Sequence, residues 1–388
     1  MGEKRLTFLE AAATVMGAGV GSGIMAVPYL AQRCGLVPFL VILAAAFGIN
    51  VLVHLMLVEV ALRDGEDLQI VELIRKYALA GRVGLVLVWA FFAVLLLAFV
   101  ANLSAYLSGA GDVVAGLTGL GVVPSKLATY AACALVVLAG LKAVGLFEKL
   151  ALWGMGATVL IVAMGMLGRP FHIEAPAAGG FGDVLGLYAV TMYCFFAFFA
   201  VPQVVKGLGR DGKRSGRAVA AGLAVNGVLT LFFALAALGV SRPVTEVAVV
   251  GISSALGGSA LGGVAAAACS VFVILAMVSS YWSVSLALAD MLRERTGLAR
   301  IPSWAVATLP SLLLVAVPGL GFIDYLSLAG GITVLIVLFV TLPMYLNARK
   351  RGPVREPGLD LGRFLPPPVL VALFVLCLLA AAGAFLSA

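Results

Sequence analysis

Long runs of apolar residues, separated by short polar stretches, follow one another through the whole chain. Each run holds about 20 residues, the length that an α-helix needs to cross the hydrocarbon core of a bilayer. The runs lie near residues 8–33, 36–62, 83–108, 125–144, 147–168, 184–205, 216–240, 262–289, 301–317, 322–346 and 367–387. No stretch between them is long enough for a soluble domain. The pattern predicts a single all-α polytopic membrane domain, residues 1–388, with about eleven transmembrane helices.

Basic residues divide unevenly between the loops on the two sides of this predicted membrane domain. With the N-terminus in the cytoplasm, the outer side holds only Arg33, Lys126, Arg169 and Arg242 of the 25 Lys and Arg residues. Cytoplasmic loops of membrane proteins carry an excess of basic residues. We therefore expect a cell (inner or plasma) membrane protein with a cytoplasmic N-terminus and, after an odd number of spans, an extracytoplasmic C-terminus.

The first apolar run contains Gly17-Ala18-Gly19-Val20-Gly21-Ser22-Gly23. In a helix interior each glycine costs about 1 kcal/mol relative to alanine. Close helix packing is one interpretation, because Gly17/Gly21 and Gly19/Gly23 both have the small-xxx-small spacing. These two pairs lie on nearly opposite faces of a helix, however, so one packing partner explains only one of them. The run favours an unwound helix centre, which is tolerated at membrane depth only where it is buried or lines a cavity.

A second break is expected in the sixth run, because Ala200-Val201-Pro202 repeats the Ala26-Val27-Pro28 of the first run. The two runs would cross the membrane in opposite directions, five spans apart, as in transporters built from inverted repeats. Residues 8–168 and 184–346 are then the two repeats, and residues 367–387 form an extra helix. Chance repetition in a chain rich in Ala and Val is the alternative.

Composition excludes several classes of protein. Hydrophobic residues make up 63% of the chain and charged residues 11%, far from the usage of soluble globular proteins. The net charge of +7 arises in short loops between apolar runs, so nucleic acid is not an expected partner. Five scattered Cys residues without a CxxC pair, and only two His residues, indicate neither a metal cluster nor a disulfide framework. Neither an enzyme nor a cofactor is expected.

The run from Gly17 to Tyr29, followed by Cys34-Gly35, resembles the first helix of bacterial and archaeal amino-acid permeases. The relevant groups are the aromatic and hydroxy amino-acid permeases and the amino acid/auxin permease family, within the amino acid–polyamine–organocation superfamily. The stretches that also resemble them are 59–63, 280–290 and 325–331. The resemblance implies the LeuT-type fold, with five-plus-five inverted repeats, one extra helix and discontinuous helices 1 and 6. The chain departs from many relatives at Phe195-Phe196-Ala197-Phe198-Phe199, where they have glycines and a polar residue.

An unwound helix centre offers free N–H groups that suit a carboxylate and free carbonyls that suit an ammonium group. We expect the half of the glycine run from Gly21 onward to bind the carboxylate of an amino acid, and the carbonyls near Gly17 and Ala18 to bind its amine. The residues expected to form the whole substrate site are Gly17, Ala18, Gly19, Gly21, Ser22, Gly23, Asn102, Tyr106, Tyr193, Cys194, Phe195 and Phe198. An apolar pocket of this kind favours aliphatic or aromatic side chains.

The coupling ion is expected to be Na⁺, with H⁺ as the alternative. The eighth run contains Ala276, Ser279 and Ser280 in the pattern A-x-x-[ST]-[ST], which supplies one carbonyl and two hydroxyls to Na⁺ in LeuT-type carriers. The resemblance adds the carbonyls of Gly17 and Val20. Hydrogen bonding between helices is an equally good interpretation of the two serines. Proton-driven carriers usually need a titratable group deep in the bundle. Here the charged residues fall near the predicted span ends, and His54 is the deepest titratable group.

These features predict a secondary transporter of neutral amino acids that works by alternating access and is coupled to Na⁺. An H⁺-coupled permease, a metal-ion carrier of the same fold, a non-transporting amino-acid sensor and a channel are the alternatives. A metal-ion carrier needs hard or thioether ligands at the first break, where only Met16 and Met25 are near. A sensor needs a cytoplasmic signalling segment, and a channel needs a filter. The expected partners are the amino acid and the lipid bilayer, and no oligomeric state is predicted.

Overall fold

The computed structural model describes residues 5–21, 23–79, 82–167, 173, 180–241, 244, 248–256, 260–317, 325 and 340–386. Within these ranges every regular element is a helix. In chain order the helices are α1 (Phe8–Gly19), α2 (Gly23–Cys34), α3 (Leu36–Asp64), α4 (Ile70–Tyr77), α5 (Arg82–Thr118), α6 (Val122–Ala139), α7 (Leu141–Met166), α8 (Phe181–Cys194), η1 (Phe198–Ala200), α9 (Val201–Gly207), α10 (Gly212–Val240), α11 (Ala248–Leu256), α12 (Ala260–Thr296), α13 (Arg300–Val315) and α15 (Pro367–Leu386). Residues 340–351 are also helical.

The helices occupy the positions that the apolar runs predict, which confirms a polytopic all-helical membrane protein. Seven described spans are long and apolar enough to cross a membrane when α8 through α9 is counted as one, or eight when the bent pair α1–α2 is also counted as one. Two further apolar helices, α13 and α15, are shorter. Of the predicted span 322–346, only Tyr325 and residues 340–346 lie among the described residues.

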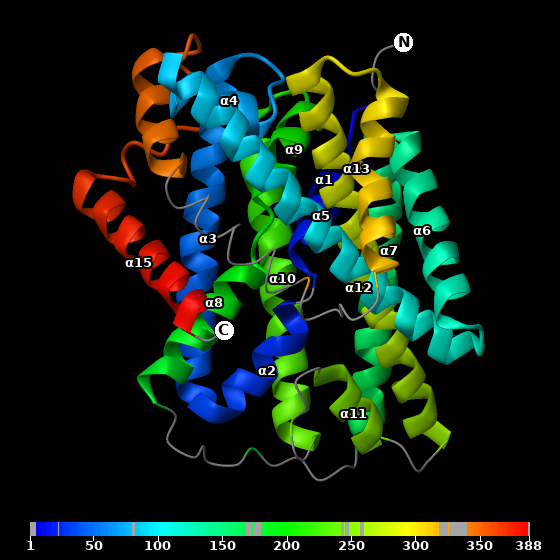
Figure 1. Ribbon diagram of the computed structural model, residues 1–388. Helices are drawn as coiled ribbons and strands as arrows, with labels where there is room; N and C mark the ends of the chain where they lie inside the picture. Colours follow the sequence, from blue (N-terminus) through cyan, green and yellow to red (C-terminus); the bar gives the residue numbers. More distant parts are fainter. Residues whose placement is uncertain are drawn as a thin grey trace.

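The first and sixth spans are both interrupted, as the sequence predicts. α1 and α2 are bent by 56° at the break after Gly19. α8 stops at Cys194 and α9 begins at Val201, with the 3₁₀ turn η1 before it. α2 packs against α8, while α1 packs against α9 and η1. The two broken spans therefore lie side by side, run in opposite directions and bring their breaks together (Figure 1).

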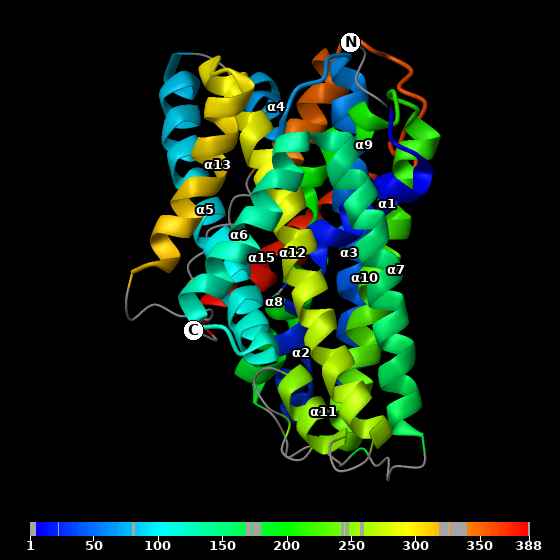
Figure 2. The ribbon, with the colours of Figure 1, turned by 90° about the vertical axis from the view of Figure 1, so that its right-hand side faces the viewer.

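Long helices surround the two broken spans. α1 packs against α7, α10 and α12, and α12 packs in turn against α5 and α7. Figure 2 shows α7, α10 and α12 extending along much of the height of the molecule beside α1 and α2. On α7, Trp153 and Leu160 are 65% and 66% exposed, whereas Glu148 is fully buried. This helix therefore presents apolar side chains outward, as a lipid-facing helix must, and directs its carboxylate into the bundle.

The loops that are predicted to face the cytoplasm gather at one end of the molecule, with α4 and α9 (Figure 1). Leu6 donates its N–H to the Gly207 carbonyl at 2.8 Å. Arg210 donates to the Ala61 carbonyl at 2.6 Å, and Arg295 forms an ion pair with Glu72 at 2.8 Å. These loops therefore share one face of the membrane domain.

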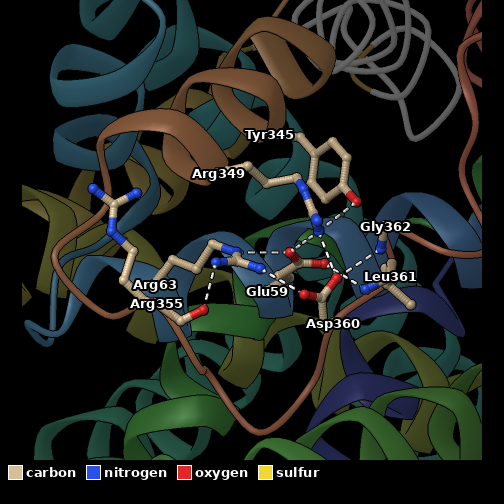
Figure 3. A network of polar contacts seen from close by, with 8 residues as sticks. All are labelled: Glu59, Arg63, Tyr345, Arg349, Arg355, Asp360, Leu361 and Gly362. Carbon is tan, nitrogen blue, oxygen red and sulfur yellow. Dashed lines mark hydrogen bonds and ion pairs between the residues drawn. The ribbon is translucent and has the colours of Figure 1, made fainter.

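At this face, a polar network surrounds Glu59 at the end of α3 (Figure 3). Arg63 and Arg349 pair with Glu59 Oε1 at 2.7 and 2.5 Å, and the Leu361 N–H donates to Oε2 at 2.8 Å. Asp360 pairs with the same two arginines at 3.1 and 2.7 Å. The network thus ties α3 to the helix of residues 340–351 and to the loop that follows it.

Candidate functional site

The four glycines of the run 17–23 are each approached by a different helix. A Cβ added to any of them would lie too close to a neighbouring side chain. In the order of the glycines, these neighbours are Glu148 on α7, Asn226 on α10, Tyr106 on α5 and Cys194 on α8. The packing and broken-helix interpretations of the sequence therefore both describe this place, because four helices converge where α1 ends.

A small cavity lies at this convergence, between α1, α5, η1 and α12. Its lining residues are Ala18, Gly19, Ala98, Phe99, Asn102, Tyr106, Tyr193, Phe196, Ala197, Phe199, Ala200, Ser283 and Val284. One side is polar, since Tyr193 donates its hydroxyl to Asn102 Oδ1 at 3.3 Å. The other side is aromatic: the ring of Phe199 lies 4.6 Å from that of Phe99 and 5.5 Å from that of Phe196. The cavity is therefore a mixed polar and aromatic site.

The volume of this cavity is about 20 Å³, which leaves room for about one water molecule. An amino acid needs several times this space. The cavity as described is therefore too small to hold an amino acid.

The cavity contains some of the residues that the sequence suggested and omits others. Ala18, Gly19, Asn102, Tyr106 and Tyr193 line it, and Gly17, Gly21 and Gly23 pack around it in the glycine run. Ser22 lies outside the described residues.

Phe195 and Phe198, which the sequence predicts at the substrate site, are not among the residues that line this cavity. The ring of Phe195 packs against Phe47 of α3 at 5.8 Å, and the ring of Phe198 packs against His54 at 6.1 Å. Phe196 and Phe199 take their place in the cavity wall. Because α8 ends at Cys194, helical spacing does not decide which side of the chain each of these rings occupies. Cys194 itself is buried against Gly23.

The second break is held by His54, whose role the sequence did not reveal. The Ala197 N–H donates to His54 Nε2 at 3.1 Å, and His54 Nδ1 lies 2.7 Å from the Asn50 carbonyl. Because a backbone N–H can only donate, Nε2 is the bare nitrogen of a neutral ring and Nδ1 carries the hydrogen. His54 thus caps a backbone group that the break of the sixth span leaves free.

The predicted sodium ligands form a hydrogen-bonded cluster at the end of α1. Ser280 Oγ lies 2.7 Å from the Gly17 carbonyl and 2.9 Å from the Ala276 carbonyl, and Ser279 Oγ donates to the Ala276 carbonyl at 3.1 Å. Val20 follows in the chain and is fully buried. Among the described residues, no group of three or more His, Cys, Asp or Glu side chains could hold a metal ion. The atoms gathered in this cluster are carbonyl and hydroxyl oxygens, the type of ligand that hard cations prefer.

Two buried polar side chains beside the glycine run were missed by the sequence argument. Both side-chain atoms of Asn226 lack a hydrogen-bond partner among the described residues, and so does Glu148 Oε2. Glu148 Oε1 accepts a hydrogen bond of 2.7 Å from Ser283 Oγ. The predicted span 147–168 placed Glu148 at a membrane end, but α7 begins at Leu141, so this carboxylate lies two helical turns further in. The expectation that all charged residues fall near span ends is therefore wrong for Glu148, the one acidic residue within α7.

The arrangement of helices is similar to that of solved structures. The structure of Mhp1, a nucleobase-cation-symport-1 family transporter in a closed conformation with bromovinylhydantoin bound, matches with a TM-score of 0.67 and 15% identity, covering 99% of this chain and 91% of that chain. MhsT in complex with L-phenylalanine matches with a TM-score of 0.64 and 14% identity, covering 100% of both chains. At these identities the similarity establishes the LeuT-type fold alone.

Family membership rests on the sequence. A search of curated protein sequences finds no matching relative. The family model of the tryptophan/tyrosine permease family matches residues 4–380, nearly the whole chain. A permease moves its substrate across the membrane without changing it chemically, so the protein is a transporter rather than an enzyme. The match extends from before α1 into α15, and the chain belongs to the tryptophan/tyrosine permease family.

Proposed function

We propose that the protein is a secondary active transporter of neutral amino acids with aliphatic or aromatic side chains, which works by alternating access and is driven by a cation gradient. The observation that carries the proposal is the cavity beside the first break, which combines free helix ends with an aromatic wall. The name of the family and the L-phenylalanine in the MhsT structure support an aromatic substrate.

The two helix ends at the first break match the two charges of an amino acid. α1 ends at Gly19, where its last carbonyls and the negative end of its dipole attract an ammonium group. α2 begins at Gly23, where free N–H groups attract a carboxylate. The rings of Phe99, Phe196 and Phe199 offer the remaining surface to an apolar side chain. A charged side chain would find no opposite charge among the residues that line the cavity.

The alternating-access part of the proposal rests on the paired breaks. Half-helices that meet at mid-membrane move as separate units around a fixed site in transporters with inverted repeats. We assign the repeats to residues 8–168 and 184–346, with the extra helix at 367–387. The face that holds α4 and the basic loops is proposed to be cytoplasmic, since it collects the predicted excess of positive charge. This orientation places the N-terminus inside and the C-terminus outside.

Two driving ions have support in this site. Na⁺ is favoured by the carbonyls of Gly17 and Ala276 together with the hydroxyls of Ser279 and Ser280. H⁺ is favoured by Glu148, a fully buried carboxyl group in contact with Gly17.

Uptake into proteoliposomes that contain the purified full-length chain tests this function. We expect accumulation of radiolabelled Trp, Tyr, Phe or Leu under an imposed Na⁺ or H⁺ gradient, and no competition from Lys or Glu. Gly21→Leu should abolish uptake because a side chain there meets the Tyr106 hydroxyl, whereas Gly48→Leu should not, because Gly48 on α3 faces open space. Preferential uptake of charged amino acids, or no uptake of any neutral one, would refute the proposal.

A further inference from the structure

We propose that the pocket between the starts of α1 and α10 binds the headgroup of an anionic phospholipid from the leaflet at the proposed cytoplasmic face. This site is separate from the cavity at the helix breaks, and it does not depend on which substrate the protein carries. Three features of the described residues support it: a pocket of suitable volume, three exposed cations that pair with no described carboxylate, and an apolar helix face that continues from the pocket into the membrane.

The pocket lies where α1 and α10 begin, at the end of the molecule that holds the basic loops. Its volume is about 480 Å³, within the range of about 300–1,000 Å³ that is typical of small-molecule sites. α1 packs along α10, and the hydrogen bond from the Leu6 N–H to the Gly207 carbonyl fixes the start of α1 beside the segment that leads into α10. The described residues that line the pocket are Phe8, Asp211, Lys213, Arg214 and Arg217.

Three of these lining residues are cations on the first two turns of α10. Lys213, Arg214 and Arg217 are exposed, and none of them forms an ion pair with a described carboxylate. Arg210, which precedes them in the chain, is different, because it pairs with Asp67 at 3.0 Å. The pocket therefore has an excess of positive charge that the described part of the chain does not neutralise.

The acidic residue in the pocket has a structural task. Asp211 is the N-cap of α10, and its Oδ1 accepts a hydrogen bond of 3.0 Å from the Arg214 N–H. The backbone at this helix end is thus capped by the protein itself, and the side chains of α10 are the groups left to bind an anion. Two guanidinium groups, each a planar fork of donors, and one ammonium group suit the oxygens of a phosphate.

The outer face of α10 favours a lipid over a soluble phosphate. Ala221, Ala224 and Val228 follow Arg217 at helical spacing, and they are half-buried, exposed and 65% exposed, respectively. Phe8, which is 36% exposed, adds an apolar ring at the pocket. A soluble phosphate contacts only the cations, whereas a phospholipid places its phosphate among them and its acyl chains along the apolar face. Basic pockets between transmembrane helices on the cytoplasmic side bind lipid headgroups in this way.

Full-length protein, purified in a neutral detergent and depleted of lipid, tests the proposal. Native mass spectrometry of lipid adducts measures the affinity, and thermal unfolding checks it, because a ligand of the folded state raises Tm. We expect phosphatidylglycerol to bind at least about tenfold more tightly than phosphatidylcholine. The triple variant Lys213→Gln, Arg214→Gln, Arg217→Gln should lose this preference. Arg217→Gln alone should reduce it by about fivefold, and it provides a milder change if the triple variant folds poorly.

Controls separate this pocket from a general attraction to positive charge. A second triple variant removes the same charge from exposed residues of the same face outside the pocket, and it should bind phosphatidylglycerol like the wild type; its substitutions are Lys350→Gln, Arg351→Gln and Arg363→Gln. Inorganic phosphate and glycerol phosphate, which lack acyl chains, should compete only weakly.

Three results would overturn the proposal. The first is unchanged preference for phosphatidylglycerol in both Arg217→Gln and the pocket triple variant. The second is an equal loss in the control triple variant, which would indicate diffuse attraction to the whole face. The third is competition by inorganic phosphate at the concentration at which the lipid binds, which would make the pocket a site for a free anion. None of these results bears on whether the protein transports neutral amino acids, which the uptake assay decides.

Discussion

Glu59 and Glu148 are both fully buried glutamates on membrane-spanning helices, and their carboxyl groups meet opposite surroundings. Glu59 accepts hydrogen bonds from two arginines and from the Leu361 N–H, so both of its carboxylate oxygens have partners (Figure 3). Glu148 accepts one hydrogen bond, from the Ser283 hydroxyl, and its other carboxyl oxygen has no hydrogen-bond partner among the described residues.

One residue type thus has two different environments in the same bundle. A buried carboxylate between two guanidinium groups fastens the segments that supply its partners. A buried carboxyl group that meets only a hydroxyl is not fastened by any cation among the described residues. Glu59 lies at the end of α3, where it ties loops together, whereas Glu148 lies at the helix break, where the transporter is proposed to move.

The largest loss of thermal stability is expected from removing the charge of Glu59. Glu59→Gln removes the buried anion of Arg63, whose side chain is 6% exposed, and leaves this arginine only Asp360, whose side chain is 53% exposed. Breaking a buried pair in this way costs about 3–5 kcal/mol. Thermal unfolding of the detergent-solubilised protein should show a large drop in Tm, whereas Glu148→Gln should change Tm little. Glu66→Gln is the control, because its side chain is 66% exposed. A Tm for Glu148→Gln as low as that for Glu59→Gln would remove the contrast between the two sites.

A second loss of stability is expected from adding a side chain at Gly17, against which Glu148 packs. Gly17→Ala introduces a Cβ that collides with the carboxyl group, and overpacking of this kind costs about 1–3 kcal/mol. The combined change Gly17→Ala plus Glu148→Ala should recover part of the lost stability, because the colliding atoms are gone. Gly48→Ala is the matched control without neighbours within 4 Å. Additive losses in the double variant would show that the two residues do not touch.

A smaller loss of stability is expected to distinguish Ser280 from Ser279 on α12. Ser280→Ala removes a hydrogen bond between α12 and α1 and should cost about 1 kcal/mol, while Ser279→Ala removes only a bond within α12. Uptake at varied Na⁺ concentration tests their role as ligands. If Na⁺ drives transport, both variants raise the Na⁺ concentration needed for half-maximal uptake. Uptake that needs no Na⁺ and is unaffected by the paired substitution would eliminate the sodium site.

The smallest loss of stability is expected from a substitution at Asp360, which lies on the exposed side of the Glu59 network. The hydrogen bond from the Arg349 guanidinium holds the pKa of Asp360 below its ordinary value of 3.8. A depressed pKa in the folded state adds stability that is present above the ordinary value and is lost as the pH falls through the folded value. Because the Asp360 side chain is 53% exposed, Asp360→Asn should cost no more than about 1 kcal/mol at neutral pH.

Thermal unfolding of Asp360→Asn and of the wild type at several pH values tests this relation between the pKa of Asp360 and stability. The difference in Tm should be constant above about pH 5 and shrink progressively below the ordinary pKa of an aspartate. A difference that persists unchanged at pH 3 would show that Asp360 contributes through its shape rather than its charge.

Much of the architecture follows from local sequence. Each span is a run whose length has to match the bilayer, and each break needs residues that cannot continue a helix. The runs 8–33 and 184–205 therefore showed the interrupted spans before any contact between helices was known. The glycine run even indicated the place where helices converge, because four residues without side chains leave room for neighbours on every side.

The sequence by itself thus determined the helical membrane fold, the two breaks and the grouping of the basic loops, because hydrophobicity and helix-breaking residues act within one span. Tertiary structure decided which side chains meet at the breaks. The Ser283–Glu148 contact joins residues 135 positions apart, and it depends on how α7 and α12 are rotated toward α1. The choice of Phe196 and Phe199 over Phe195 and Phe198 depends on irregular backbone after Cys194. Such rotations and irregular turns are set by packing between helices, to which hydrophobicity along the chain is insensitive.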